Sequence, residues 1–287
     1  MKLGAQTQKR LIKSILDDLG LTDDNVKCQP SPMSSSKLLS RHPNSPSFDN
    51  NFNYRRVIGK LLFLEKSSRP DLTYAVHQCA RFSHDPKVEH GNAVKRIGRY
   101  LKGTMDKGLI MKSDLSSKLQ LHVDADFAGN WDKEIASNDP ATAQSRHGYV
   151  LSYCGIPLLW ASQLQSIIAL STTEAEYIGM SKALQDTLPV LWILQEMHDL
   201  GFKVHATKAD VHCRVFQDNS GAVEIANVPK YRPRTKHINQ RYHFFRSHVG
   251  KHLTVLPIDT RDQVADIFTK PLNLAAFLKH RRTLQGW

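Results

Sequence analysis

The sequence lacks the marks of a membrane-spanning or exported protein. Its 287 residues contain no run approaching the roughly 20 apolar residues that a helix needs to cross a bilayer. The N-terminus, MKLGAQ, has no apolar segment of the kind found in signal peptides. We therefore expect a protein that is not secreted and has no membrane partner.

Cysteine is also scarce. The chain has four, and their wide spacings match no zinc-binding motif. Free buried thiols in a reducing compartment are the expectation, which suits a protein of the cytoplasm or nucleus. The four residues are Cys28, Cys79, Cys154 and Cys213.

Charge is present in excess but unevenly placed. The net charge is +12, and residues 1–112 contain 20 Lys and Arg against 10 Asp and Glu, whereas residues 113–287 contain 19 against 17. A basic half favours a polyanionic partner, most simply nucleic acid, although a basic surface can also serve only solubility. The difference predicts two parts of distinct character.

Helical patterns dominate the basic part. Apolar residues at helical spacing predict one helix at 7–20 and three more within 54–103, and the Ser/Pro-rich segment 29–53 is expected to be a loop. The last of these helices has a basic stripe at i, i+1, i+4 and i+7, which is expected either to contact phosphates or simply to face solvent. The stripe consists of Lys95, Arg96, Arg99 and Lys102.

Strand patterns begin near residue 118. The alternation predicts strands at 119–129, 148–153 and 156–162, and two later strands reached through helices. We expect a long helix after Ser171, a second helix opening at Pro189, strands at 210–218 and 252–258, helices at 219–227 and 238–251, and a helical segment from Arg261. Three antiparallel strands followed by two parallel ones predict a five-stranded mixed sheet flanked by helices.

Five carboxylates stand within a strand, at a strand end or at the start of a helix. Asp124 lies inside the first strand, Asp218 ends the fourth, Glu174 and Glu176 open the long helix, and Asp266 opens the last. One such group usually caps a helix or stabilises its dipole. Pairing of the fourth strand with the first would gather several of them, and convergent carboxylates repel one another unless a cation is present. Two Mg²⁺ ions about 3.5–4 Å apart would resolve the repulsion and form a phosphodiester-cleaving clamp.

Seven ordered motifs lie between Tyr54 and Leu272 and carry a resemblance that covers nearly all of the chain from about residue 7 onward. They are YRRVIGKLLFLEKSSRPDLTYAV, EHGNAVKRIGRYLKGT, HVDADFAGNW, GYVLSYCGIPLLWASQLQSIIALSTTEAEYIGMSKA, FQDNSGAVEIA, RTKHINQRYHFFR and QVADIFTKPL. Together they resemble the C-terminal part of a copia-type retrotransposon polyprotein. The resemblance implies a helical reverse transcriptase thumb and connection remnant at 1–112, followed by a ribonuclease H-like α/β domain at 113–287.

The same resemblance implies roles for individual residues. It assigns two Mg²⁺ ions, with Mn²⁺ as a substitute, to Asp124, Glu176, Asp218 and Asp266, which would hydrolyse the RNA strand of an RNA–DNA hybrid. Glu174 stays open as an alternative to Glu176. The family often keeps a loop histidine near the metals, and His237 is the candidate by position, although other histidines lie nearby.

The implied partners are an RNA–DNA hybrid and the upstream polymerase palm and fingers of the parent polyprotein. The polymerase active site is expected to lie upstream, so this chain is not expected to polymerise DNA. The implied location is a cytoplasmic virus-like particle or the nucleus. Besides the basic stripe, nucleic-acid contacts are expected from Asn219, Arg234 and Lys236.

Two other functions compete with a nuclease. One is an inactive nucleic-acid-binding remnant of a transposon, which substitution of any of the four acids would favour, and all four are present. The other is an integrase-like DNA transferase, which uses three acids and lacks the QDNS and ADIF motifs. The chain also departs from the family at Gly91, where an aromatic residue is usual, and at 132–146, which replaces a shorter segment.

Overall fold

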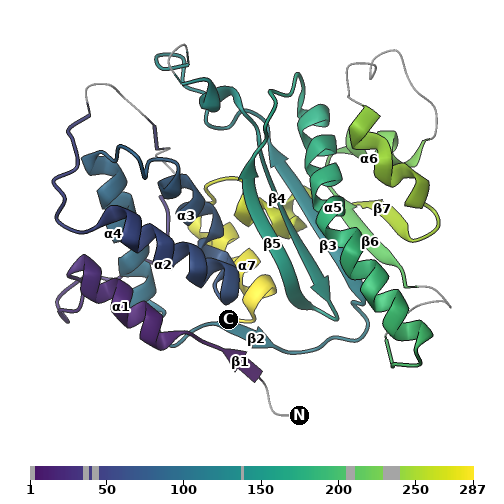
Figure 1. The fold of residues 1–287 in the computed structure, drawn as a ribbon, viewed down its shortest axis with the longest axis horizontal. Helices are drawn as coiled ribbons and strands as arrows, with labels where there is room; N and C mark the ends of the chain where they lie inside the picture. The colour runs from purple at the N-terminus through teal and green to yellow at the C-terminus, as the bar shows by residue number, and fades with distance from the viewer. Residues whose placement is uncertain (1–3, 35–38, 41–44, 137–138, 205–210, 229–239) are drawn as a thin grey trace. The chain divides into compact units, whose positions relative to one another are not determined.

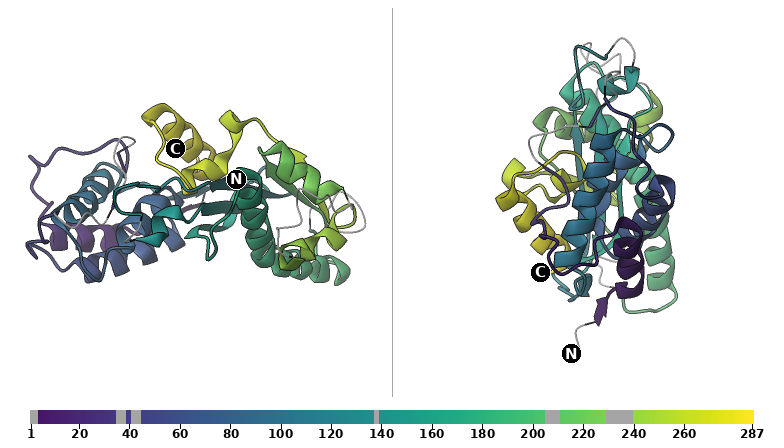
Figure 2. Two further views of the ribbon diagram at one scale, coloured as in Figure 1. Left: turned by 90° about the horizontal axis from the view of Figure 1, so that it is seen from above. Right: turned by 90° about the vertical axis from the view of Figure 1, so that its left-hand side faces the viewer.

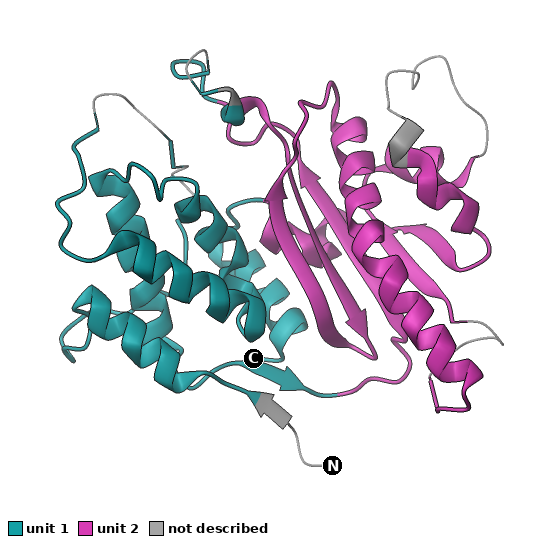
Figure 3. Ribbon diagram, viewed as in Figure 1, with its two compact units in different colours: residues 1–112, 132–142, 270–287 teal, residues 113–131, 143–269 magenta. Residues whose placement is uncertain are grey.

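The computed structural model describes residues 4–34, 39–40, 45–136, 139–204, 211–228 and 240–287 (Figure 1). They form two compact units (Figure 3), of which unit 1 comprises residues 1–112, 132–142 and 270–287, and unit 2 comprises residues 113–131 and 143–269. Residues 132–142 and 270–287 lie within the predicted 113–287 domain and form part of compact unit 1. Within the described ranges, no helix is long and apolar enough to span a membrane.

Unit 1 is mostly helical, as the sequence predicted. Its first helix buries Ile12, Ile15, Leu16 and Leu19, which recur on one face at the helical period. The elements are β1 (Gly4–Gln6), α1 (Lys9–Leu19), α2 (Tyr54–Ser67), η1 (Pro70–Leu72), α3 (Thr73–Ala80), α4 (Val88–Gly103), β2 (Leu109–Met111) and α7 (Leu274–Gln285). A short 3₁₀ segment, η2 (Pro140–Ala143), begins within the 132–142 segment and ends one residue beyond it.

A buried ion pair explains why the C-terminal helix belongs to unit 1. Arg69 and Asp71 lie 2.9 Å apart with side chains fully shielded from solvent. The Tyr100 hydroxyl donates to Asp71 at 2.6 Å, and the Gln285 amide of α7 donates to it at 3.0 Å. Burial alone would raise the pKa of Asp71, but Arg69 and these donors hold it below its ordinary value. An ion pair this deep requires all its partners, so α7 is fixed to the unit.

Unit 2 is built around one five-stranded sheet. Its elements are β3 (Leu119–Asp126), β4 (Arg146–Tyr153), β5 (Ile156–Leu164), α5 (Thr172–Asp199), β6 (Cys213–Gln217), α6 (Ser220–Asn227), η4 (Gln240–His248), β7 (Leu253–Pro257), η5 (Thr260–Asp262) and η6 (Val264–Phe268). The strand order is β5-β4-β3-β6-β7, with β3, β4 and β5 antiparallel and β6 and β7 added in parallel. This topology confirms the predicted ribonuclease H-like α/β fold with a five-stranded mixed sheet.

The two faces of the sheet carry different elements. Leu121 and Val123 of β3 are buried in a core that includes Tyr177 and Leu184 of α5. Because side chains alternate along a strand, Asp124 points to the opposite face. On that face β3 and β4 contact η6, and Figure 2 shows α5 and η6 on opposite sides of the sheet. The alternation therefore separates the core from the acidic side chain.

Three local predictions were wrong. Pro189 does not open a helix, because α5 runs through it from Thr172 to Asp199. The segment from Arg261 is not one helix but two 3₁₀ turns followed by α7. Cys28 is exposed, whereas the other three cysteines are buried as expected, and burial raises the pKa of Cys79 and of Cys213 to about 12. For Pro189, the ring removes one backbone hydrogen bond from α5. Packing of α5 against β3 and β4 offsets that cost.

Gly91 shows what replaces the family's usual aromatic residue. A methyl group on Gly91 of α4 would lie 2.4 Å from Cε2 of Phe48, so the Phe48 ring occupies the space beside the helix. That ring packs edge-on against Phe52, with centroids 4.9 Å apart, and against Tyr54. An aromatic side chain from the 29–53 segment thus fills the volume that a residue at 91 would otherwise fill.

We predict that Gly91→Ala lowers the free energy of unfolding by about 1–2 kcal/mol, because overpacking outweighs the gain in helix propensity. Urea denaturation measures this. Gly59→Ala in α2 is the matched control, because a methyl group there would meet no atom within 4 Å beyond the neighbouring residues and the backbone of its own helix. It should stabilise the fold by up to about 1 kcal/mol. Combining Gly91→Ala with Phe48→Leu should shrink the cost, and equal costs in both backgrounds would contradict the packing explanation.

Candidate acidic metal site

The pairing of β3 with β6 places the first two acids. These strands pair in parallel from Leu119 with Cys213 to His122 with Phe216. Asp124 and Asp218 each lie two residues beyond the last pair, so the same register brings them opposite one another. Asp124 is 1% exposed and Asp218 is half-buried. The sequence prediction that the fourth strand brings Asp218 near Asp124 agrees with this register.

A close approach of η6 to the sheet places the third acid, Asp266. The register sets Gly148 of β4 opposite Asp124, and a methyl group on Gly148 would lie 2.5 Å from Cβ of Phe268. Only a residue without a side chain leaves room there for the end of η6. Asp266 lies within η6 and is 5% exposed.

Gln263 fixes the start of η6 to both strands. Its buried side-chain amide donates to the carbonyl oxygens of Val123 at 2.9 Å and of Phe216 at 3.4 Å. Its own oxygen accepts the N–H of Ala265 at 3.3 Å. The amide therefore fills the gap where β3 and β6 stop pairing, and holds η6 over it.

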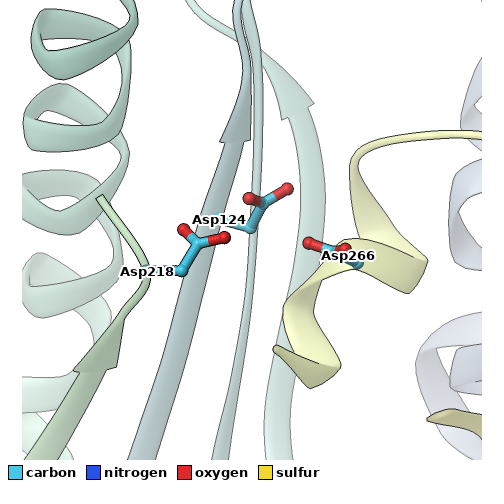
Figure 4. A group of neighbouring side chains, drawn as sticks. All are labelled: Asp124, Asp218 and Asp266. Carbon is cyan, nitrogen blue, oxygen red and sulfur yellow. The ribbon is translucent and has the colours of Figure 1, made fainter. Parts of the chain in front are cut away.

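The three aspartates converge. One carboxylate oxygen from each of Asp124, Asp218 and Asp266 lies within 4.8 Å of the other two, and Figure 4 shows the side chains gathered from β3, the end of β6 and η6. Three carboxylates at this separation repel one another strongly in a partly buried site. An all-oxygen donor set suits a hard divalent cation such as Mg²⁺ or Mn²⁺, so the residues fit the metal that the sequence predicted.

The two glutamates of α5 have different partners. Glu174 belongs to the helix cap, because the Ser171 hydroxyl accepts its N–H at 3.1 Å and its own carboxylate accepts the N–H of Leu170 at 2.7 Å. Glu176 accepts instead from the side-chain amide of Gln217, the residue before Asp218, at 3.1 Å. Glu176 is therefore the glutamate attached to the strand that carries an acid of the cluster.

Several residues predicted to contact nucleic acid also make contacts within the chain. The basic stripe on α4 is half-buried. Arg96 donates to the Ser31 hydroxyl, Lys102 donates to the carbonyl of Asp23, and Lys95 lies over the Phe52 ring. Asn219 caps α6 by accepting the N–H of Ala222 at 2.9 Å. The remaining candidates, Arg234, Lys236 and His237, lie outside the described residues.

Sequence reasoning missed the residues that support the acids. Gln217 and Gln263 are fully buried, and Thr269, 1% exposed, donates from its hydroxyl to the Asp124 carboxylate. Their positions beside the acids in QDNS and ADIFTK were the available signal. A neutral side chain next to an acid has many ordinary roles, so the motifs alone did not single these residues out.

Comparison with known proteins gives relatives over nearly the whole chain. The Pol polyprotein of transposon RE2 from Arabidopsis thaliana is 34% identical over 254 residues, 88% of this chain. The Pol polyprotein of transposon TNT 1-94 from Nicotiana tabacum is 32% identical over 270 residues, 92% of this chain. The chain belongs to the family of retrovirus-related Pol polyproteins of copia-type transposons.

The chain is short relative to these Pol polyproteins, since the matches span 16% and 19% of their lengths. No family model matches it. Among solved structures, LC11-RNase H1 in complex with an RNA/DNA hybrid is similar with 18% sequence identity and a TM-score of 0.35, over 53% of this chain and 94% of that one.

We predict that Mn²⁺ or Mg²⁺ raises the unfolding temperature of this Pol-family chain, because an ion bound only by the folded state stabilises it by about 2.7 kcal/mol at 100 times its dissociation constant. Asp218→Asn should abolish most of the rise. Without metal it should leave stability unchanged or slightly higher, because it removes like-charge repulsion. Differential scanning fluorimetry checks both, with Asp199→Asn at the far end of α5 as control. A full metal response in Asp218→Asn would contradict the site.

A second prediction concerns His147, a buried histidine outside the acidic cluster. Burial, with the nearby charges of Arg146 and Lys182, lowers the pKa of His147 to about 4. Below about pH 6.5, His147 is therefore protonated in the unfolded chain but stays neutral in the folded chain. The free energy of unfolding consequently decreases as the pH falls from about 6.5 toward 4.

Between pH 7 and pH 4.5 this histidine should account for about 2–3 kcal/mol of lost stability. Urea denaturation of His147→Gln beside the parent protein measures the contribution as the difference between their pH dependences. His84→Gln, at an exposed site, is the control. Parallel pH profiles for His147→Gln and the parent would show that the buried ring does not carry the effect.

Proposed function

We propose that this chain contains the ribonuclease H of a retrotransposon Pol polyprotein and hydrolyses the RNA strand of RNA–DNA hybrids with divalent metal ions. The observation that carries the proposal is the convergence of Asp124, Asp218 and Asp266 within 4.8 Å at the end of the central strand pair. Membership of the Pol family supports it, because such polyproteins belong to retrotransposons.

In this proposal Asp124, Glu176, Asp218 and Asp266 would hold the ions, with Asp124 supplied by the central strand of the sheet. Two bound Mg²⁺ ions would supply an activated water and stabilisation of the leaving oxygen. Glu174 serves the helix cap instead, since its carboxylate already accepts the N–H of Leu170. The Gln217 amide keeps Glu176 directed toward the end of β6.

The proposal also assigns a function to each compact unit and describes how the chain would bind a hybrid. We assign the nuclease to unit 2 and the thumb and connection remnant to unit 1, including its C-terminal segment 270–287. The hybrid backbone would be held by basic residues, giving affinity that falls with salt and does not depend on sequence. Contacts to 2′-hydroxyl groups would distinguish RNA from DNA. His237 stays a prediction for the loop histidine, and the upstream polymerase domains stay the proposed covalent partner.

We predict that the purified chain cuts a labelled RNA–DNA hybrid in Mg²⁺ and leaves single-stranded RNA and duplex DNA intact. Asp124→Asn should reduce the rate by at least about 100-fold, because electrostatic stabilisation at a metal site contributes several kcal/mol. Glu174→Gln is the matched control and should keep most of the activity, whereas Glu176→Gln should lose it.

Gel analysis of end-labelled RNA, with a chelator control, checks this prediction. Hybrid binding without cleavage by the folded protein would instead support an inactive nucleic-acid-binding remnant. Cleavage that survives Asp124→Asn would place the chemistry elsewhere. Equal losses in Glu174→Gln and Glu176→Gln would remove the assignment of the fourth acid.

A further inference from the structure

Thr269 connects two acids of the cluster that lie far apart in the sequence. Its hydroxyl donates to Oδ2 of Asp124, a residue 145 positions earlier. The same hydroxyl oxygen lies 3.3 Å from the carbonyl oxygen of Asp266, to which the Thr269 backbone N–H donates at 3.2 Å. The side chain therefore contacts the acid on the central strand while its backbone closes the turn that carries the acid on η6.

The surroundings leave little freedom for this contact. Thr269 is 1% exposed and directly follows η6. Its Cγ2 would lie 3.0 Å from a methyl group on Gly148, the residue paired with Asp124 across the sheet. The threonine methyl thus packs on β4 while the hydroxyl faces β3.

We propose that Thr269 is a positioning residue that orients the Asp124 carboxylate for divalent metal binding and sets the separation of Asp124 and Asp266. A hydroxyl has one proton to donate, and a carboxylate is a stronger acceptor than a peptide carbonyl, so the proton goes to Asp124. That hydrogen bond fixes the direction of one oxygen of Asp124 and so restricts rotation of the whole carboxylate. The inference rests on the proposed function, since it names a support for the same metal site.

The chemistry explains why a hydroxyl suits this place. A basic side chain would neutralise Asp124 and compete with the cation, whereas a hydroxyl donates one hydrogen bond and leaves the negative charge of the site intact. Partners of this kind around metal ligands typically change metal affinity by about 10–100-fold when they are removed. The hydroxyl, rather than the volume of the side chain, is the feature that the site requires.

The test compares Thr269→Val, which keeps the shape and removes the hydroxyl, with Thr269→Ser, which keeps the hydroxyl and removes a methyl. Calorimetric titration with Mn²⁺ measures affinity without any turnover. Thermal unfolding in chelator measures metal-free stability. We expect Thr269→Val to bind Mn²⁺ about 10–100-fold more weakly and to unfold at a lower temperature in chelator, because Asp124 loses a buried donor. Thr269→Ser should bind Mn²⁺ within about threefold of the parent protein, and both variants should stay cooperatively folded in chelator. If Thr269→Val fails to fold, Thr269→Ala provides the hydroxyl-free variant.

A Mn²⁺ affinity in Thr269→Val equal to that of the parent protein would overturn the inference. Equal losses of affinity in the valine and serine variants would also overturn it, because they would assign the effect to packing.

Hybrid cleavage separates this inference from the proposed function. A parent protein that binds Mn²⁺ through Asp124 but never cuts hybrid would refute the nuclease, while a weakened valine variant would still support Thr269. If the parent protein cuts the hybrid and Thr269→Val binds Mn²⁺ as tightly as the parent, only the positioning role of Thr269 is refuted. If the parent protein binds no Mn²⁺, both the positioning role and the proposed function are refuted.

Discussion

Repulsion between three carboxylates is the constraint on which the arrangement of unit 2 depends. Bringing Asp124, Asp218 and Asp266 within 4.8 Å of one another costs free energy, which the fold must supply when no cation is bound. The supports are neutral and buried. Gln263 ties η6 to the carbonyl oxygens of two strands, and Thr269 ties it to Asp124. Neutral donors hold the acids in place without cancelling the charge that attracts a cation.

The acids come from separate stretches of the chain, and the end of one strand pair unites them. Hydrogen bonding between β3 and β6 stops after His122 and Phe216, and the acids lie just past that point. Parallel strands end at the same edge of a sheet, which is where ligand sites gather in α/β folds. Within unit 2, Gln263 holds the start of η6 to β3 and β6, and Thr269 holds its end to Asp124.

Sequence analysis predicted the features that depend on local periodicity. It failed for features that depend on contacts between residues far apart in the chain. Alternation along 119–126 correctly placed Asp124 on a strand, and the strand and helix order predicted the mixed sheet. Pro189 misled because packing of α5 on the sheet outweighs a local preference. The place of α7 depends on a hydrogen bond between Gln285 and Asp71, which are 214 residues apart. Local pattern carries no information about such a pair, and the same holds for Thr269 and Asp124.

The most direct test of the account is to locate the metal itself. Crystals of the chain soaked in Mn²⁺ would give an anomalous difference map that shows the ion independently of any assay. The account predicts a peak within coordination distance, about 2–2.6 Å, of carboxylate oxygens of Asp124, Asp218 and Asp266. A peak held by other residues, or full Mn²⁺ binding in solution with no peak at these three aspartates, would contradict it.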